Sequence, residues 1–281
     1  MHALLADAVD VDAYFQRIGY TGPRGASLET LAALHHLQPC AIAFEDLDPL
    51  LQRPVILTAA AFERKLLHGG RGGWCYEQNL MLGRVLQSLG FGVTGLAARV
   101  LWNQPEGTVR ARTHMLLRVE GVADGPYIAD VGFGGLTMTG PLRLVPDLEQ
   151  PTPHEVFCLR HEPDGTYILQ ALVRDAWKPL YCFDLQPQAL IDYEIWNWHL
   201  CHHPDSPFAR NLMAARVTPE RRYGLLNNRL SIHHLHGASE QTTLTTSAQL
   251  RETLTGPLNI RLPEEDPELD ALLERVVSIR T

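Results

Sequence analysis

The pattern of apolar residues changes at Gly90, and this change limits the folds open to the chain. Before Gly90, leucines recur at helical spacing at positions 28, 31, 34 and 37, and segments 58–67 and 75–89 show the same spacing. After Gly90, short runs such as GVTGLAARVLW, HMLLRV and YIADVGF are separated by Gly, Pro and Asp clusters. Such runs are typical of an antiparallel sheet or barrel. Helices followed by strands predict an α+β protein.

Residues that favour helix ends mark the expected helices. Ser27 and Thr58 are suitable N-caps, and Gly90 stands where a left-handed C-cap belongs. Beyond residue 199 the chain mixes a Pro-rich loop, strand-like pieces and a final helix over 267–279, with Pro267 in its first turn.

Composition excludes several classes of protein. The 281 residues are 45% hydrophobic and 20% charged, which is a globular mix. At about 150 residues per domain, the length suggests two domains or one core with an added module. The formal charge of −8 argues against a nucleic-acid binder and against docking to anionic membranes.

The cysteines and the N-terminus indicate a reducing compartment. Five cysteines without a CxxC pair predict neither a disulfide framework nor a cysteine zinc knuckle. The first residues carry three acids before the first arginine, unlike a secretory signal, and no apolar run reaches 18 residues. We expect a cytoplasmic protein.

Cys75 has the setting of a reactive thiol. In RGGWCYEQN (71–79), two glycines lead into a predicted helix and place this cysteine at or near the helix N-terminus. Unpaired N–H groups and the helix dipole favour negative charge there, and the thiolate is the nucleophilic form of cysteine. A small buried core residue is the alternative. For Cys40, Cys158 and Cys182, which have apolar neighbours, the core interpretation is favoured.

His114 and Asp130 are a candidate base and its orienting acid. His114 opens the expected strand THMLLRV, whose alternation puts Leu116 and Arg118 on its face. The turn GVADG (121–125) leads into a second expected strand, PYIADVGF. In a hairpin centred on residue 122, Asp130 lies opposite His114 or one position away. A slip of one residue would turn Asp130 to the other face, so a structural role stays open.

Two further patterns are less specific. The run DVGFGG (130–135) permits close approach of the main chain, but it is not a nucleotide-binding motif, and a tight turn is the simpler interpretation. The clusters WHLCHH (198–203) and HHLH (233–236) lack a second spaced ligand pair and the HExxH arrangement. Surface or ligand-lining histidines are favoured there, and we expect no metal site.

Taken together, RGGWCYEQN, RTHMLLRV and YIADVGFGG resemble the arylamine N-acetyltransferase family in order and spacing. Further similarity lies in AFEDLD (43–48), TPHEVF (152–157), YCFDLQP (181–187) and HPDSPFARNL (203–212). The resemblance covers roughly residues 10–215, with a looser match beyond.

The chain departs from the family pattern at three positions. Ala43 and Asp46 replace the Pro and Asn of the usual PFEN stretch, and Trp74 stands where Tyr or Phe is common. Asp46 is expected to alter a buried hydrogen bond, and Trp74 the pocket beside the thiol. The departures concern acceptor preference rather than the chemistry.

The resemblance implies three parts with a papain-like thiol core. These are a helical bundle with the nucleophile (1–90), a β-barrel with the His and Asp (91–198) and a C-terminal α/β lid (199–281). It also implies acetyl transfer from acetyl-coenzyme A to the nitrogen of arylamines, arylhydrazines or N-hydroxyarylamines, as in xenobiotic metabolism. Acetyl-coenzyme A would be a co-substrate, with no tightly bound cofactor, and the protein a monomer or homodimer.

In this interpretation Cys75, His114 and Asp130 form a catalytic triad. Cys75, as a thiolate paired with protonated His114, attacks the thioester, and the acceptor amine then attacks the acetyl-cysteine in a ping-pong sequence. The candidates for contacts to coenzyme A are Thr113, Phe133, Gly134, Gly135 and Trp102. The candidates for apolar acceptor walls are Phe44, Tyr76 and Phe208, together with Phe133, and core packing is an alternative for each.

Three other functions would use parts of the same pattern. An amide synthase of the family, closing a macrolactam from a carrier-bound polyketide, would keep the triad but not use acetyl-coenzyme A. A thiol protease or transglutaminase-type enzyme would act on peptides or glutamine side chains. In a redox or binding module without catalysis, Cys75 would be dispensable.

Overall fold

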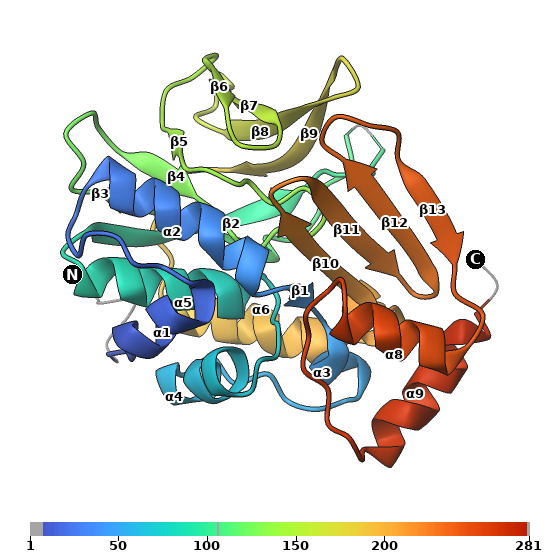
Figure 1. Cartoon of the computed structure of the whole chain (residues 1–281). Coiled ribbons are helices and arrows are strands. Elements are labelled where there is room, and N and C mark those ends of the chain that lie inside the picture. The colour runs from blue at the N-terminus through green and yellow to red at the C-terminus, as the bar shows by residue number, and fades with distance from the viewer. Residues whose placement is uncertain (1–7, 106, 280–281) are drawn as a thin grey trace.

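Helices fill the first part of the chain, as the leucine spacing predicts. The structure, a computed structural model, describes residues 8–105 and 107–279 (Figure 1). The helical elements before Gly90 are α1 (Val11–Ile18), α2 (Leu28–Ala41), α3 (Leu47–Leu50), α4 (Ala59–Phe62), a π-helix (Glu63–His68) and α5 (Cys75–Ser88).

The helix ends follow the predicted signals. The side chain of Ser27 accepts a hydrogen bond from the N–H of Thr30, and Thr58 caps α4 in the same way. Gly90 has the left-handed conformation, with φ of +92°, directly after α5 and its C-cap. Segment 58–67 differs from the expectation of one regular helix, because α4 continues as a π-helix.

Eight antiparallel strands form a nearly closed barrel. Their order is β5-β4-β3-β2-β9-β8-β7-β6. Their bounds are β2 (Gly92–Val100), β3 (His114–Glu120), β4 (Tyr127–Ala129), β5 (Leu142–Arg143), β6 (Glu149–Pro151), β7 (Val156–His161), β8 (Tyr167–Val173) and β9 (Ala176–Phe183). The Gln150 side chain joins the two edge strands, accepting from Arg143 N at 2.7 Å and donating to Arg143 O at 3.0 Å. This amide takes the place of a ladder pair where the barrel would otherwise be open.

The two faces of β3 belong to different cores. Leu116 packs inside the barrel, whereas Met115, Leu117 and Val119 pack with α5 and the other N-terminal helices. The alternation predicted for this strand is therefore confirmed. It places His114 on the face that points into the barrel.

A second antiparallel sheet joins the C-terminal residues to the N-terminal ones. Its order is β1-β10-β11-β12-β13, and its bounds are β1 (Phe44–Glu45), β10 (Met213–Thr218), β11 (Arg221–Leu226), β12 (Arg229–His234) and β13 (Glu240–Thr243). Helices α8 (Ser247–Thr255) and α9 (Pro267–Val277) share a separate leucine-rich core with this sheet. The expected final helix is thus confirmed, ending two residues earlier than predicted.

Two more helices complete the architecture. Helices α6 (Leu190–His202) and α7 (Pro207–Arg210) lie between the barrel and the second sheet in the chain.

The α+β class is confirmed. The division at residues 90 and 198 stays a prediction, and α6 runs through the second of these boundaries. None of the described helices is long and apolar enough to cross a membrane.

Candidate active site

The RGG motif brings the main chain into α5 so that Cys75 is the first residue of the helix. Only glycine fits at position 72, because a Cβ there would lie 2.3 Å from the carbonyl oxygen of Ala43. Trp74, the N-cap residue, is extended, and its N–H donates to Glu77 Oε2 at 3.1 Å. The glycines and the Glu77 contact together fix where Cys75 stands.

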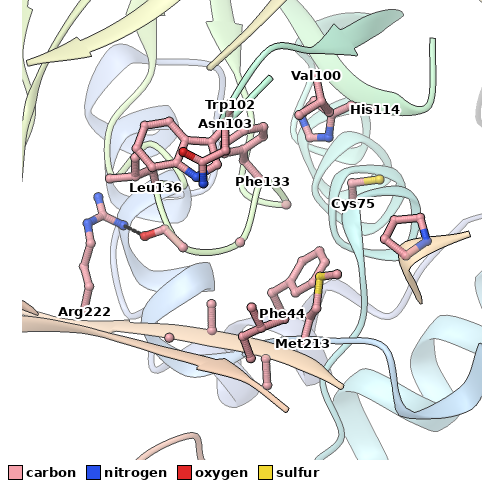
Figure 2. A pocket seen from close by; sticks show the side chains of 18 of the residues that line it. Phe44, Cys75, Val100, Trp102, Asn103, His114, Phe133, Leu136, Met213 and Arg222 are labelled. Carbon is pink, nitrogen blue, oxygen red and sulfur yellow. Dashed lines mark hydrogen bonds between the residues drawn. The ribbon is translucent and has the colours of Figure 1, made fainter. Parts of the chain in front are cut away.

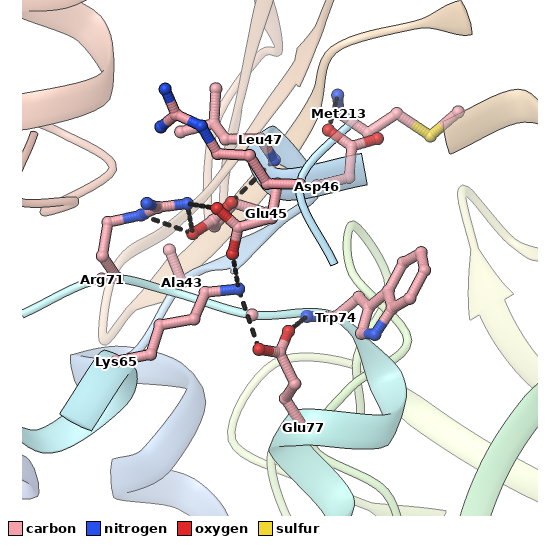
Figure 3. Close-up of polar contacts among 12 residues, drawn as sticks. Ala43, Glu45, Asp46, Leu47, Lys65, Arg71, Trp74, Glu77 and Met213 are labelled. Carbon is pink, nitrogen blue, oxygen red and sulfur yellow. Dashed lines mark hydrogen bonds and ion pairs between the residues drawn. The ribbon is translucent and has the colours of Figure 1, made fainter. Parts of the chain in front are cut away.

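Buried ion pairs hold the start of this helix (Figure 3). Lys65 Nζ lies 2.8 Å from Glu77 Oε1 and 2.6 Å from Asp48 Oδ2, and Arg71 lies 2.8 Å from Glu45 Oε1. Burial alone would lower the pKa of Lys65, but the carboxylates of Glu77, Glu45 and Asp48 raise it. The lysine therefore stays charged and links the middle of the π-helix to α5.

His114 and Asp130 form a buried pair beside the thiol. His114 Nε2 lies 2.7 Å from Asp130 Oδ2. Burial acts to lower the pKa of His114, but the charge and hydrogen bond of Asp130 and the neighbouring Cys75 thiol raise it to about 10. Burial would raise the pKa of Asp130, but His114, Asn79 and the N–H of Gly132 lower it. At neutral pH the pair is imidazolium and carboxylate.

The register of the hairpin differs from the predicted one by two residues. β3 and β4 pair as Leu117↔Ala129 and Val119↔Tyr127, so the hairpin is centred on residue 123 instead of 122. Asp130 follows the end of β4, and extending the register by one residue sets it opposite Leu116, two positions from His114 and not opposite it or one position away. The connection over 121–126 is longer than the expected turn. Because the shift is even, Asp130 stays on the face of His114 and reaches it diagonally.

The DVGFGG run brings its main chain against the nucleophile. A Cβ on Gly132 would lie 2.6 Å from Cys75 Cα, so any side chain there would displace the start of α5. Gly134 has φ of +88°, a conformation that side chains rarely adopt. A turn and a close approach both account for this run.

A cavity of about 1220 Å³ lies at the junction of the barrel, the start of α5 and the C-terminal sheet (Figure 2). Cys75 and His114 both line it, and Asp130 lies behind His114. Seven of the predicted binding residues line the same space: Phe44, Trp102, Thr113, Phe133, Gly134, Gly135 and Phe208. The ring of Phe133 packs edge-on to His114, with 5.2 Å between ring centroids.

Tyr76 is the predicted binding residue that the structure places elsewhere. Its side chain is fully buried, and the described lining of the cavity does not include it. Its hydroxyl donates to the carbonyl oxygen of Thr113 at 2.9 Å, and the thiol of Cys75 lies 3.9 Å from the same oxygen. Tyr76 therefore supports the wall from behind.

The three departures from the family pattern have visible consequences. Asp46 is buried, its Oδ1 accepts the N–H of Met213 at 2.8 Å, and its Oδ2 has no partner among the described residues. Burial raises the pKa of this carboxyl well above its usual value. Trp74 packs edge-on to Phe208, with ring centroids 5.4 Å apart, and so supports a cavity wall. At position 43 the small Ala side chain is buried in the C-terminal core.

Several residues of the site were not predicted from the sequence. Asn79 donates to Asp130 Oδ1 at 2.9 Å, and its place four residues after Cys75 on α5 was a usable signal. Met213 and Arg222 line the cavity from the C-terminal sheet. No local pattern marks them, because the sheet is held near the thiol by contacts between distant segments, such as the pairing of β1 with β10 and the hydrogen bond from Arg222 to Thr137 O.

The histidine clusters lie at the surface or on the cavity wall. His199 and His203 line the cavity, whereas His202 is exposed and stacks on Trp198. In the second cluster, His233 and His234 also line it. Within residues 8–105 and 107–279, no group of three His, Cys, Asp or Glu side chains is placed to hold a metal ion.

Comparison with known proteins gives a consistent picture at the level of sequence. The profile of a family described as N-acetyltransferase matches residues 27–266. The arylamine N-acetyltransferase of Mycobacterium tuberculosis is 40% identical over 260 residues, which cover 92% of this chain and 91% of that protein. A Salmonella typhimurium protein named arylamine N-acetyltransferase / N-hydroxyarylamine O-acetyltransferase is 40% identical, over 86% of this chain and 85% of its own length.

Solved structures agree with the sequence comparison. The Mycobacterium marinum arylamine N-acetyltransferase superposes with a TM-score of 0.92 at 38% identity, covering 95% of this chain and 100% of that one. The same protein in complex with CoA gives a TM-score of 0.90 at 38% identity, covering 95% and 99%. The predicted α+β architecture is confirmed by these likenesses.

Proposed function

The chain belongs to the arylamine N-acetyltransferase family, and we propose that Cys75, His114 and Asp130 are the triad that performs its acetyl transfer. The family makes the protein an acetyltransferase with a coenzyme A-type substrate. The proposed donor is acetyl-coenzyme A, and the proposed acceptors are arylamines, arylhydrazines and N-hydroxyarylamines. The two half-reactions share an acetyl-cysteine intermediate and follow ping-pong kinetics.

The observation that carries the proposal is the charged pair at the thiol. His114 Nε2 lies 2.7 Å from a carboxylate that stays ionised, so Nε2 carries a proton and Nδ1 is the nitrogen left to exchange a proton with Cys75. The thiol belongs to the first residue of α5 and lines the cavity together with His114. A thiolate beside a histidinium is a ready nucleophile.

In the first half-reaction, the sulfur of Cys75 attacks the thioester carbonyl carbon of acetyl-coenzyme A. The bond from that carbon to the coenzyme A sulfur breaks, and His114 Nδ1 gives its proton to the leaving thiolate. Asp130 holds the Nε2–H throughout, so that the ring keeps one orientation and one tautomer.

In the second half-reaction, the acceptor nitrogen attacks the carbonyl carbon of acetyl-Cys75. The carbon–sulfur bond breaks, His114 accepts the proton that the nitrogen loses, and the thiolate–histidinium pair is restored. Water must be kept from the acetyl-enzyme, because hydrolysis of the acetyl-cysteine would otherwise compete with transfer to the acceptor. Phe44 and Phe208, whose ring centroids lie 6.3 Å apart on the cavity wall, are the proposed apolar barrier and acceptor contacts.

The cavity has room for both substrates in turn. Thr113, Phe133, Gly134, Gly135 and Trp102 line it from the barrel side and are the proposed contacts to coenzyme A. The CoA complex of the Mycobacterium marinum protein supports a coenzyme A site in this fold. The name of the Salmonella protein supports N-hydroxyarylamines as acceptors.

The proposal is tested by the intact mass of the protein after mixing with acetyl-coenzyme A and no acceptor. We expect a gain of one acetyl group, lost again when an arylamine or hydrazine is added. Cys75→Ala should show no gain. Cys201→Ala is the matched control, because both cysteines are free and 6% exposed.

Two results would contradict the proposal. An acetyl group that still forms on Cys75→Ala would place the nucleophile elsewhere. No adduct on the wild type, with Cys75 fast to alkylate, would discard acetyl-coenzyme A as donor and favour a carrier-bound acyl group or a peptide.

A further inference from the structure

Three successive main-chain amides follow β4, and each is held by a side chain. The N–H of Asp130 donates to His35 Nε2 at 3.0 Å, that of Val131 to Asn79 Oδ1 at 3.0 Å, and that of Gly132 to Asp130 Oδ1 at 2.9 Å. β4 ends at Ala129, so these donors lie beyond the end of that ladder. Buried N–H groups need acceptors, and here side chains from α2, α5 and the loop itself supply them.

His35 is built to be an acceptor. Its side chain lies in the middle of α2 and is 0% exposed. Burial lowers the pKa of His35 to about 4, and the nearby charge of Asp130 offsets this only in part. The ring is therefore neutral at physiological pH, and Nε2 can accept only if the proton is on Nδ1. A charged ring would have no lone pair for the Asp130 amide.

The main-chain hydrogen bond from Asp130 to His35 bears on where the Asp130 carboxylate lies, and this carboxylate orients His114. The carboxylate of Asp130 is divided between two tasks, with Oδ2 on His114 and Oδ1 on the Asn79 amide and the Gly132 N–H. Rotation of the Asp130 main chain would carry both oxygens away from their partners. Asn79 restrains the peptide that follows Asp130, and His35 restrains the peptide that precedes it.

We propose that His35 is a positioning residue for acetyl transfer, holding the main chain of Asp130 so that its carboxylate meets His114 Nε2. This inference rests on the proposed function of the triad. His35 is not among the described residues that line the cavity, and the N–H of Asp130 is its printed link to the triad. It lies 40 residues before the nucleophile and on a different helix.

Three substitutions distinguish positioning from packing. His35→Gln keeps an acceptor oxygen near the position of Nε2, whereas His35→Asn is polar but too short to reach the amide. His35→Leu fills similar space without an acceptor. His36→Leu is the matched control on the same helix, since the His36 ring faces His154, with ring centroids 6.5 Å apart.

Two measurements are needed for each variant. One is the pH profile of Cys75 alkylation by iodoacetamide, followed by intact mass, and the other is kcat and KM for acetyl-coenzyme A and an arylamine. We expect the Asn and Leu variants to lose about 10-fold to 100-fold in kcat with little change in KM, and to alkylate only at higher pH. The Gln variant should restore both toward wild type, and His36→Leu should change neither.

A purely structural His35 would give a different result. The Asn and Leu variants would then melt at lower temperature but keep the wild-type alkylation profile and kcat, and this outcome overturns the proposal. If His35→Leu does not fold, equal profiles for the Gln and Asn variants overturn it as well. If the wild type is not acetylated at all, the proposed function fails, while the alkylation profiles still decide the role of His35.

Discussion

Asp130→Asn should separate the charge of the aspartate from its shape. Oδ1 of Asp130 accepts two N–H donors, from Asn79 and Gly132, each at 2.9 Å. An asparagine must therefore keep its carbonyl oxygen at that position and turn its NH₂ group toward His114 Nε2. Because the NH₂ group is a donor, Nε2 must become an acceptor, and the remaining proton moves to Nδ1. The nitrogen beside the thiol then carries a proton on a neutral ring and cannot accept the proton of Cys75.

The size of the effect follows from the charge state of the ring. With a pKa of about 10, His114 is protonated at pH 7.5 in a ratio of ~300 to 1. Without the carboxylate, burial dominates and should bring the pKa below 6.5, so that at most about one ring in ten is charged at that pH. Together with the wrong tautomer, we expect acetylation of Cys75 to slow by ~10³-fold to 10⁴-fold. This corresponds to about 4 to 5.5 kcal/mol in the barrier.

The acetylation rate is measured directly by rapid mixing with acetyl-coenzyme A, chemical quenching at set times and intact-mass analysis. Asp184→Asn is the control, because it also removes a carboxylate from an ion pair, with Arg112, but outside the described cavity lining. The alkylation profile of Cys75 should move to higher pH in Asp130→Asn alone. Acetylation within tenfold of wild type, with a folded protein, would refute the assignment of Asp130 as the residue that sets the His114 tautomer.

The remaining predictions concern stability, measured by thermal and denaturant unfolding. Gly132→Ala should cost about 1–3 kcal/mol because its Cβ would overlap the first residue of α5, whereas Gly135→Ala, which meets open space, should be near neutral. Asp46→Asn should leave stability unchanged near pH 4 and raise it at pH 8. A carboxyl whose folded pKa is raised loses stability as pH rises above its unfolded value of 3.8, and asparagine has no such loss. Lys65→Met should cost about 3–5 kcal/mol, because the buried Glu77 carboxylate loses the Lys65 cation while Asp48 keeps Arg71, against about 0–1 kcal/mol for Arg24→Met at an exposed pair. If Lys65→Met and Arg24→Met lowered the free energy of unfolding equally, the buried ion pairs of Lys65 would not be important for stability.

The sequence by itself determined most of the local structure and the chemistry of the candidate site. Helix caps at Ser27, Thr58 and Gly90 depend on neighbouring residues only, and the structure has all three where they were expected. The placement of Cys75 at a helix start is equally local, since the two glycines before it and the helical pattern after it lie in one short motif. Alternation along β3 put His114 on the correct face.

What the tertiary structure decided are contacts between segments far apart in the chain. The hairpin register depends on a connection whose conformation no local rule fixed, so the predicted register is shifted by two residues, although Asp130 still meets His114 on the same face. Tyr76 was expected at the substrate, but the rotation of α5 turns it inward against Thr113. Local pattern carries no information about such distances.

The same reason explains His35 and Arg222. In the sequence, a histidine on a helix indicates nothing beyond ordinary packing. Its role depends on the end of β4 lying beside it, where the N–H of Asp130 needs an acceptor. Arg222 reaches the cavity through contacts between distant segments, among them the pairing of β1 with β10 and its own hydrogen bond to Thr137 O. Sequence sets which side chains can do chemistry, through propensity and periodicity, whereas long-range packing sets which of them meet.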